Sequence, residues 1–376
     1  MRIAILGAGP AGLYLAYLLR RNQPEHQIEV HEQNPPDATF GFGLAFSDRA
    51  LEFLKKDDPE TYAAILPATN PWRDSILYLN GEEIRIDGMN YAGIGRLALL
   101  TILQARARSV GIEPAYRRAV TSLDELGEPD LIVGADGANS LVRRTHQAEF
   151  GTTVKLLNNR FAWYGTTRRF EALGHTFVAN ELGTFNAHHH PHAPDMSTFV
   201  VEVDAATFQR AGFDRMPLGE AQSFCEKVFA GTLDGHPMVA NNSIWRQFPR
   251  IRNERWSTGR CVLMGDALRT AHFSIGSGTR LAMEDAIALE LALRKHGQDV
   301  PAALAAYEAA RKPISTKLWN AANTSSDWYE RFPEHMKLDP LDFAHSYVTR
   351  SGRIRMDRLR KSSPEFVARY EARKAA

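Results

Sequence analysis

The chain has 376 residues, of which 44% are hydrophobic, so it can bury a large core and form two domains. Lysine and arginine number 45 and aspartate and glutamate 44, and the net charge of +1 gives no electrostatic case for a nucleic-acid or membrane partner. Cys225 and Cys261 are too few for a disulfide framework, and no run of about eighteen apolar residues predicts a membrane span. Because the first predicted strand begins at residue 2, we expect no signal peptide and a cytoplasmic location.

The N-terminal segment combines a strand, a glycine-rich turn, a helix and a second strand. An apolar run at 3–6 precedes Gly7-Ala8-Gly9-Pro10-Ala11-Gly12, and the next strand-like run ends at Glu32. Gly7 allows a tight turn, Gly9 lets backbone amides approach a pyrophosphate, and Gly12 lets the helix pack close to the strand. The helix N-terminus favours phosphate, and Glu32 can accept hydrogen bonds from a ribose. The segment predicts a dinucleotide-binding unit rather than an ordinary βα turn.

The following elements alternate between helix and strand and suggest an antiparallel sheet in the middle of the chain. Residues 75–86 predict a hairpin with Asn80-Gly81 as its two-residue turn. The other predicted elements are helices at 48–56, 95–109, 204–213, 219–229, 277–295 and 301–329, strands at 131–133 and 260–264, and several β-rich runs between 160 and 203.

Two further junctions place an acid and a glycine at the end of a predicted strand. The first is Asp136-Gly137, and the second is Gly265-Asp266, which is followed by Gly276-Ser277-Gly278-Thr279 and a long helix. A glycine-rich turn that opens a helix can direct amide dipoles at a flavin ring, and Asp266 can accept from ribityl hydroxyls. Either junction alone also fits an ordinary strand-to-turn element, whereas the three in this order indicate a flavin site.

The three segments together resemble the FAD-dependent aromatic hydroxylases, the single-component group A monooxygenases with the para-hydroxybenzoate hydroxylase fold. The resemblance covers nearly the whole chain. It implies an α/β fold with a Rossmann-like FAD-binding domain interleaved with an antiparallel-sheet substrate domain. It also implies non-covalent FAD, NADH or NADPH as reductant, O2, and a flavin C4a-hydroperoxide as the hydroxylating agent. The residues that it assigns to FAD are Gly7, Gly9, Pro10, Ala11, Gly12, Glu32, Arg96, Asp266, Gly276, Ser277, Gly278 and Thr279, with Asp136 near the pyrophosphate.

Departures from the family pattern point to a narrower subgroup. Ala267-Leu268-Arg269 replaces the usual Ala-Ala-His, and Phe273 replaces a proline near the flavin. The subgroup contains the monooxygenases that act on salicylyl-CoA and 2-aminobenzoyl-CoA, and the indole hydroxylase of violacein biosynthesis. The segments that resemble it are residues 42–48, 163–166, 197–202 and 270–278. A further segment, residues 349–354, resembles the CoA-thioester enzymes more than the indole enzyme. The resemblance implies 5-hydroxylation of an ortho-substituted benzoyl-CoA. The alternatives are an indole or tryptophan-derived hydroxylase of secondary metabolism, and an FAD-binding protein without turnover.

Several side chains are candidates for the substrate site. His272 either hydrogen-bonds substrate or shapes its loop, and Phe273 helps to keep the flavin dry. Five further candidates are Phe46, Trp163, Tyr164, His188 and His190; alternation along a strand puts the two histidines on one face. The cluster at 188–192 lacks the acids or cysteines of a metal site, so no metal is expected.

The basic end of the chain is the candidate site for CoA phosphates. Nine lysines or arginines and three acids lie between residues 350 and 374, and Arg350 and Arg353 are the nominated phosphate ligands. The alternative is a solvated helix surface. The predicted division is an FAD-binding domain at 1–74, 92–155 and 255–330, a substrate domain at 75–91 and 156–254, and a helical basic tail at 331–376, with no prediction of oligomeric state.

Overall fold

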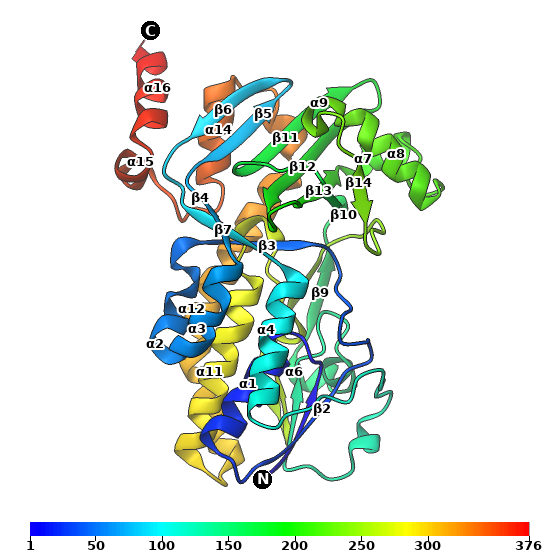
Figure 1. Ribbon diagram of the computed structural model, residues 1–376, viewed down its shortest axis with the longest axis vertical. Helices are drawn as coiled ribbons and strands as arrows, with labels where there is room; N and C mark the ends of the chain where they lie inside the picture. Colours follow the sequence, from blue (N-terminus) through cyan, green and yellow to red (C-terminus); the bar gives the residue numbers. More distant parts are fainter. Residues whose placement is uncertain (376) are drawn as a thin grey trace.

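The computed structural model, which describes residues 1–375, shows two lobes along the long axis of the molecule (Figure 1). One lobe contains a mostly parallel sheet covered by helices, and the other contains a larger, mostly antiparallel sheet. A small sheet joins them, with β7 (Tyr91–Gly95) between β3 (Gly43–Ser47) and β4 (Asn70–Trp72). None of the described helices combines the length and the apolar character that crossing a bilayer requires.

The first lobe is built on a five-stranded sheet in the order β16-β17-β8-β1-β2. Four of its strands run parallel and only the edge strand β16 is antiparallel. Parallel strands are covered on both faces, which explains the unbroken apolar runs at 3–6 and 131–133. The strand bounds are β1 (Arg2–Leu6), β2 (Gln27–His31), β8 (Leu131–Gly134), β16 (Ser257–Thr258) and β17 (Cys261–Leu263).

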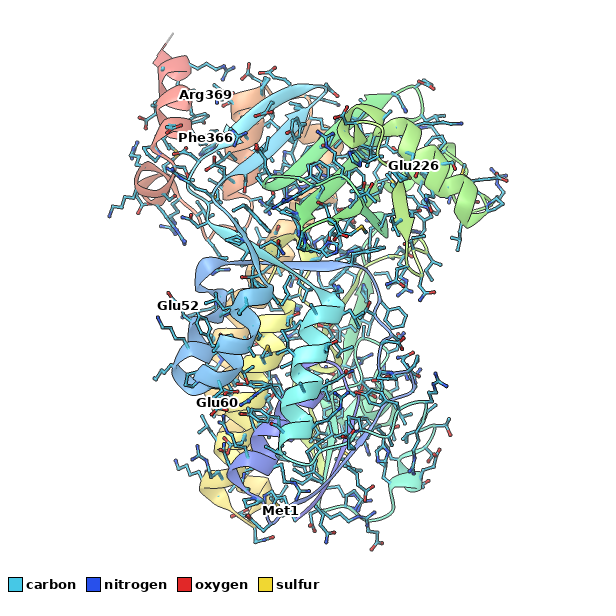
Figure 2. All side chains as sticks on the ribbon, viewed as in Figure 1. Met1, Glu52, Glu60, Glu226, Phe366 and Arg369 are labelled. Carbon is cyan, nitrogen blue, oxygen red and sulfur yellow. The ribbon has the colours of Figure 1, made fainter. Side chains whose placement is uncertain are left out.

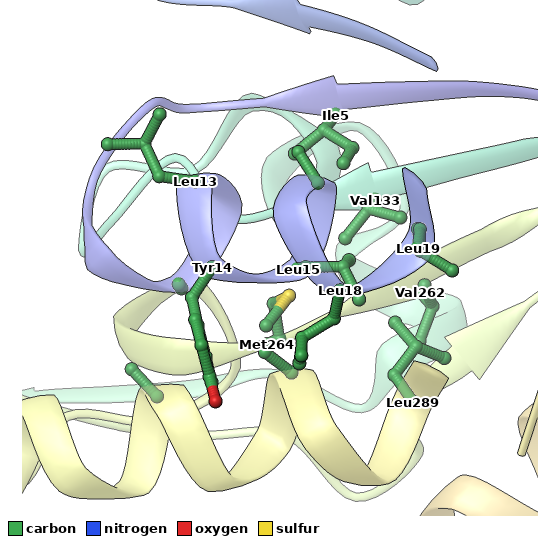
Figure 3. Close-up of a cluster of buried hydrophobic side chains, with 14 of the residues drawn as sticks. Ile5, Leu13, Tyr14, Leu15, Leu18, Leu19, Val133, Val262, Met264 and Leu289 are labelled. Carbon is green, nitrogen blue, oxygen red and sulfur yellow. The ribbon is translucent and has the colours of Figure 1, made fainter. Parts of the chain in front are cut away.

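Helix α1 (Pro10–Asn22) lies between this sheet and α11 (Gly278–His296). Its buried residues include Tyr14 and Leu18, which point toward α11 in Figure 3. Because α1 is apolar around most of its circumference, it is buried on both sides. The other elements of this lobe and of the join are η1 (Asp48–Leu51), α2 (Glu52–Asp57), α3 (Pro59–Ile65), η2 (Leu66–Ala68), α4 (Arg96–Ser109), η3 (Leu123–Leu126), α5 (Leu141–Thr145), α6 (Gln147–Phe150), β9 (Thr153–Leu156), β15 (Pro249–Arg252), α10 (Gly265–Leu268), η4 (Phe273–Ile275) and α12 (Val300–Tyr329).

The second lobe is a seven-stranded sheet in the order β14-β10-β13-β12-β11-β5-β6. The hairpin β5–β6 turns at Asn80 and Gly81, which both have positive φ (49° and 93°), as a two-residue turn of this kind requires. β5 then pairs in parallel with β11. The bounds are β5 (Ser75–Leu79), β6 (Glu82–Ile86), β10 (Arg160–Thr166), β11 (Leu173–Asn180), β12 (Gly183–Pro191), β13 (Ser197–Val203) and β14 (Met238–Ala240), with α7 (Ala205–Arg210), α8 (Leu218–Val228) and α9 (Ala230–Leu233) at one side.

The C-terminal tail is helical and packs on the β5–β6 hairpin rather than lying free in solvent. Phe343, Leu359 and Phe366 are fully buried in one cluster with Ile84 and Ile86 of the hairpin. The tail helices are α13 (Phe332–His335), α14 (Pro340–Thr349), α15 (Met356–Ser362) and α16 (Pro364–Ala375). One face of the tail therefore buries aromatic side chains, while basic residues such as Arg355 and Arg360 are exposed.

The α/β fold class, the antiparallel sheet and the helical C-terminal region predicted from the sequence are confirmed. The hairpin predicted at 75–86 is β5–β6, and the long helices predicted at 277–295 and 301–329 are α11 and α12. The domain boundaries stay a prediction.

Replacing Phe366 by alanine should destabilise the packing of the tail on the hairpin. Phe366 is fully buried in the cluster with Ile84 and Ile86, whereas Arg369 is exposed on the same helix, which Figure 2 labels at both residues. Truncating a buried phenylalanine costs about 3–5 kcal/mol, and an exposed substitution changes stability by less than about 0.5 kcal/mol. Chemical denaturation compares the free energy of unfolding of Phe366→Ala with that of Arg369→Ala, and limited proteolysis compares how readily the tail is cleaved in each. Equal stability of the two variants would show that α16 does not contribute to the hydrophobic core.

Candidate functional site

A cavity of about 350 Å³ lies where the two lobes and the tail meet. It brings together segments that are far apart in the sequence: β3, the first turn of α4, one face of the seven-stranded sheet, η4 with the start of α11, and the tail from 347 to 358. Predicted site residues that line it are Phe46, Arg96, Trp163, His188, His190, Asp266, Phe273, Gly276, Ser277, Gly278, Thr279, Arg350 and Arg353. Residues 7–12, Glu32, Asp136, Tyr164 and His272 lie outside the lining.

The turn at residues 7–12 has the backbone geometry that a nucleotide site needs. Gly7 has a φ of 101°, and a Cβ on Gly12 would lie 1.9 Å from the carbonyl oxygen of Gly7. A Cβ on Gly9 would meet nothing within 4 Å, so the surface there is open. Gly9 is the N-cap of α1 and Pro10 its first residue, so no side chain occupies the first backbone N–H groups of the helix. These groups are available to a phosphate.

Two acids flank this turn. Glu32 accepts hydrogen bonds from the backbone N–H groups of Ala8 (2.9 Å) and Asn34 (2.8 Å), which fixes its carboxylate at the end of β2. Asp136 accepts from the N–H of Leu141 at 2.6 Å through one oxygen, while its other oxygen is buried without a partner. Burial raises the pKa of Asp136, and hydrogen bonds that include one from Ser140 oppose the rise. The unpartnered oxygen marks a place where a bound group can donate.

Arg96 is a buried cation on the cavity wall. Its Nε has no partner, and its guanidinium lies 4.6 Å from the ring centroid of Trp163. Burial lowers the pKa of Arg96 to about 10, and the charge of Asp266 opposes this. Burial also raises the pKa of Asp266, whose carboxylate opens into the cavity. A buried guanidinium with an unused donor favours an anionic or hydrogen-bond-accepting ligand at this point.

The turn at residues 276–279 faces the same space. Gly276 has a φ of 58°, and a Cβ there would lie 2.3 Å from the carbonyl oxygen of Ala45, so only glycine fits. Ser277, the N-cap of α11, makes no side-chain capping bond, and its hydroxyl instead donates to Ile275 O at 3.1 Å. A Cβ on Gly278 would meet nothing within 4 Å. The first N–H groups of this 19-residue helix are thus open to a ligand.

The opposite wall is aromatic. Phe273 lies 5.6 Å from Trp163 and 5.2 Å from His188, measured between ring centroids. His188 and His190 both line the cavity, while His189 between them stacks on Phe170 at 3.9 Å, as strand alternation predicts. Aromatic rings on several sides form a slot suited to a flat apolar ring.

Tyr164 and His272 lie elsewhere than the substrate site predicted for them. Tyr164 is on the other face of β10 from Trp163 and is buried in the core of the second lobe. His272 stacks on Phe273 at 4.2 Å and its Nδ1 is 2.9 Å from Ser274 Oγ. Burial lowers the pKa of His272 to about 3. The geometry therefore favours the loop-shaping interpretation of His272 over direct contact with substrate.

The tail arginines separate into three environments. Arg350 is internal, since its guanidinium donates to Ser325 Oγ, Tyr347 O and Ser274 O at 3.0, 2.7 and 2.7 Å. Arg353 and Arg358 line the cavity, and neither forms an ion pair with a carboxylate among the side chains that the structure describes. The pKa of Arg353 is lowered by burial and by the charges of Arg280 and Arg358. Arg355 and Arg360 lie outside the lining, and Arg360 pairs with Glu371 at 2.8 Å.

Sequence reasoning missed several lining or supporting residues. His175, Tyr347 and Arg280 also line the cavity, and Glu202 is buried directly behind His188. One signal was available, because Glu202 is the one charged residue of strand β13 and has valine on both sides. Tyr347 gave none, because its position depends on how the tail folds back on the sheet.

The residues present fit FAD. Two open helix N-termini, the unpartnered Nε of Arg96 and the open carboxylate of Asp266 match the pyrophosphate, the ring edge and the ribityl hydroxyls of that cofactor. In the part of the chain that the structure covers, no group of three or more His, Cys, Asp or Glu side chains is arranged to hold a metal ion.

Comparison with known proteins gives the same assignment. The model of the FAD binding domain family matches residues 106–322. The chain is 40% identical to the salicyloyl-CoA 5-hydroxylase of a Streptomyces species, over 93% of this chain and 70% of that one. It is 34% identical to the 3-hydroxy-4-methyl-anthranilyl-[aryl-carrier protein] 5-monooxygenase of Streptosporangium sibiricum, over 94% and 95%. It is 31% identical to the protodeoxyviolaceinate monooxygenase of Chromobacterium violaceum, over 93% and 94%.

Solved structures show the same fold at low identity. The tetrameric form of 2-methyl-3-hydroxypyridine-5-carboxylic acid oxygenase superposes with a TM-score of 0.72 at 18% identity, covering 96% of this chain and 95% of that one. The family match over more than half of the chain, together with relatives above 30% identity, places the sequence in one group of enzymes. The chain belongs to the FAD-dependent aromatic monooxygenases with the para-hydroxybenzoate hydroxylase fold.

Proposed function

We propose that this FAD-dependent monooxygenase hydroxylates an ortho-substituted benzoyl-CoA, such as salicylyl-CoA, at the ring carbon para to the ortho hydroxyl or amino group. The observation that carries the proposal is the pair Arg353 and Arg358, two cations without carboxylate partners among the described residues, on the wall of an aromatic cavity. Binding a small phenol requires no pair of cations, whereas the phosphates of CoA bind well to arginine side chains. Two relatives are named for aryl groups carried on CoA or on a carrier protein, which supports a thioester.

The proposal assigns the FAD site to the two open helix ends and the groups between them. Residues 7–12 and Glu32 would hold the adenosine and pyrophosphate, and Arg96, Asp266 and residues 276–279 the ribityl chain and ring. Bound FAD supplies the redox chemistry, taking reducing equivalents from NADH or NADPH and activating O2. The protein positions the flavin ring, excludes water from it and binds the negative charges of the cofactor.

The aromatic slot would hold the substrate ring. Phe273, Trp163 and Phe46 line it without a charged group of their own, and burial lowers the pKa of His190 to about 3, so that side chain is neutral there. A slot that excludes water favours hydroxylation over release of hydrogen peroxide. A cytoplasmic location and the absence of nucleic-acid and membrane partners stay predictions from composition.

The protein as purified should be yellow and release FAD on denaturation, and Glu32→Ala should weaken that binding. Loss of a charge-assisted hydrogen-bond acceptor costs about 1.5–3 kcal/mol, or roughly ten- to a hundredfold in the dissociation constant. Glu29→Ala is the matched control, because Glu29 is an exposed acid on the same strand. Flavin fluorescence titration measures both. An unchanged dissociation constant for Glu32→Ala would remove Glu32 from the cofactor site.

Salicylyl-CoA should accelerate flavin reduction and yield a product one oxygen heavier, whereas free salicylate at the same concentration should do neither. The preference should weaken as salt rises, because phosphate–arginine attraction is screened. Stopped-flow reduction and mass spectrometry at several salt concentrations test this. Equal activity on the free acid, or activity on an indole alone, would contradict the thioester proposal.

Arg353→Ala and Arg358→Ala should each raise KM for salicylyl-CoA about tenfold, since a charge-assisted hydrogen bond is worth at least about 1.5 kcal/mol. The flavin reduction rate at saturating substrate should stay near wild type. Arg355→Ala is the control, because Arg355 is an exposed arginine of the same segment outside the cavity lining. A KM change of the same size in Arg355→Ala would indicate only a general charge effect.

A further inference from the structure

One acid is buried in the sheet face that lines the cavity. Glu202 of β13 is 2% exposed, and one carboxylate oxygen lies 3.0 Å from Nε2 of His188 on the neighbouring strand β12. The other oxygen accepts from Asn159 Nδ2 at 2.8 Å, and that same amide nitrogen lies 2.9 Å from Tyr329 O. No arginine or lysine lies within ion-pair distance of Glu202 in the described chain. The carboxylate is therefore directed at an imidazole rather than at a permanent cation.

This contact decides which nitrogen of His188 carries the proton. A carboxylate accepts, so Nε2 of neutral His188 is the N–H donor and Nδ1 keeps its lone pair. His188 lines the cavity, and its one hydrogen bond among the described side chains is made by Nε2, not by Nδ1. The ring is also held in place by Phe273 at 5.2 Å, His175 at 4.7 Å and Tyr329 at 4.8 Å. The result is a fixed, uncharged proton acceptor beside the aromatic slot.

The surroundings keep His188 neutral and Glu202 ionised before substrate binds. Burial lowers the pKa of His188, Glu202 opposes this, and the charge of Arg350 lowers it further. Burial raises the pKa of Glu202, but the hydrogen bonds from His188 and Asn159 are among the interactions that outweigh it, so that its pKa is lowered. The titratable and charged groups that face the pair are His175, His190, His272, Tyr329 and Arg350.

We propose that His188, positioned by Glu202, takes the proton from the ring hydroxyl of the substrate; this rests on the proposed function. The O–H bond of the hydroxyl breaks, an N–H bond forms at Nδ1, and the electron pair stays on the phenolate oxygen. The Glu202 carboxylate stabilises the imidazolium that results. The phenolate pushes electron density to the para carbon, the position to be oxygenated. The same groups return the proton to the product.

The test compares His188→Gln and Glu202→Gln with wild type as FAD-loaded enzymes supplied with salicylyl-CoA. His188→Gln removes the imidazole that accepts the proton. In Glu202→Gln the amide can donate to Nε2 of His188, which favours the tautomer with the proton on Nδ1, so that Nδ1 can no longer accept. Both variants should still show substrate-accelerated flavin reduction, while product per NADH falls and hydrogen peroxide rises. The rate of product formation near neutral pH should drop about a hundredfold, the usual contribution of a general base, and recover as pH approaches the substrate's own phenol pKa. His236→Gln, an exposed histidine outside the cavity, is the control.

A second measurement needs no variant. Absorbance titration of salicylyl-CoA bound to the oxidised wild-type enzyme should show the ring hydroxyl ionising at lower pH than in free solution. An unshifted titration, or variants with wild-type coupling at every pH, would overturn the role of His188. If salicylyl-CoA fails to accelerate flavin reduction even in the wild type, the proposed substrate is wrong, and the proton transfer from it is wrong as well.

Discussion

The site depends on one buried carboxylate, Asp285 of α11. It accepts from the backbone N–H of Gly265 at 3.1 Å, from two nitrogens of Arg269 at 2.8 and 3.0 Å, and from Arg311 of α12 at 3.3 Å. Its side chain is fully buried. Removing one member of such a network leaves uncompensated buried charge and costs about 3–5 kcal/mol. Asp285 thus fixes the strand end that carries Asp266 against the helix that begins at Gly278.

A second connection joins the tail to this framework. Arg350 is bound to Ser274 O next to the glycine turn and to Ser325 of α12, and its guanidinium lies 4.0 Å from the ring centroid of Tyr347. The tail therefore forms part of the cavity wall and is not an appendage. Positive charge from Arg353 and Arg358 is on this wall, while His188 and His190 on the sheet are kept neutral by burial. The tail thus contributes cations to the cavity wall, and the sheet contributes neutral imidazoles.

Local sequence patterns predicted those parts of the site that depend on neighbouring residues. The turn at 7–12, the hairpin at Asn80-Gly81 and the shared face of His188 and His190 follow from turn chemistry and from strand alternation. Strand alternation also requires Trp163 and Tyr164 to face opposite ways, but only the packed sheet shows which of them faces the cavity.

Features that depend on distant packing could not be predicted in this way. His272 does not line the cavity, because Phe273, on which it stacks, occupies the cavity wall at this point. The sequence alone does not show which of these two neighbours reaches the cavity. The internal position of Arg350 depends on contacts with residues 274 and 325. Burial of Phe343 and Tyr347 of α14 depends on the β5–β6 hairpin, which lies more than 250 residues earlier in the chain.

The parallel pairing of β5 with β11 bears on the order in which the protein can fold. During synthesis the hairpin emerges long before residues 173–180, so one of its edges has no strand to bind, and an isolated hairpin is marginally stable in water. The aromatic tail that covers it arrives last of all. The sheet of the first lobe is also completed late, because β17 is synthesised only after all the strands of the seven-stranded sheet. Neither lobe can mature independently on the ribosome, and slow, highly non-local folding is the kinetic consequence of interleaving them.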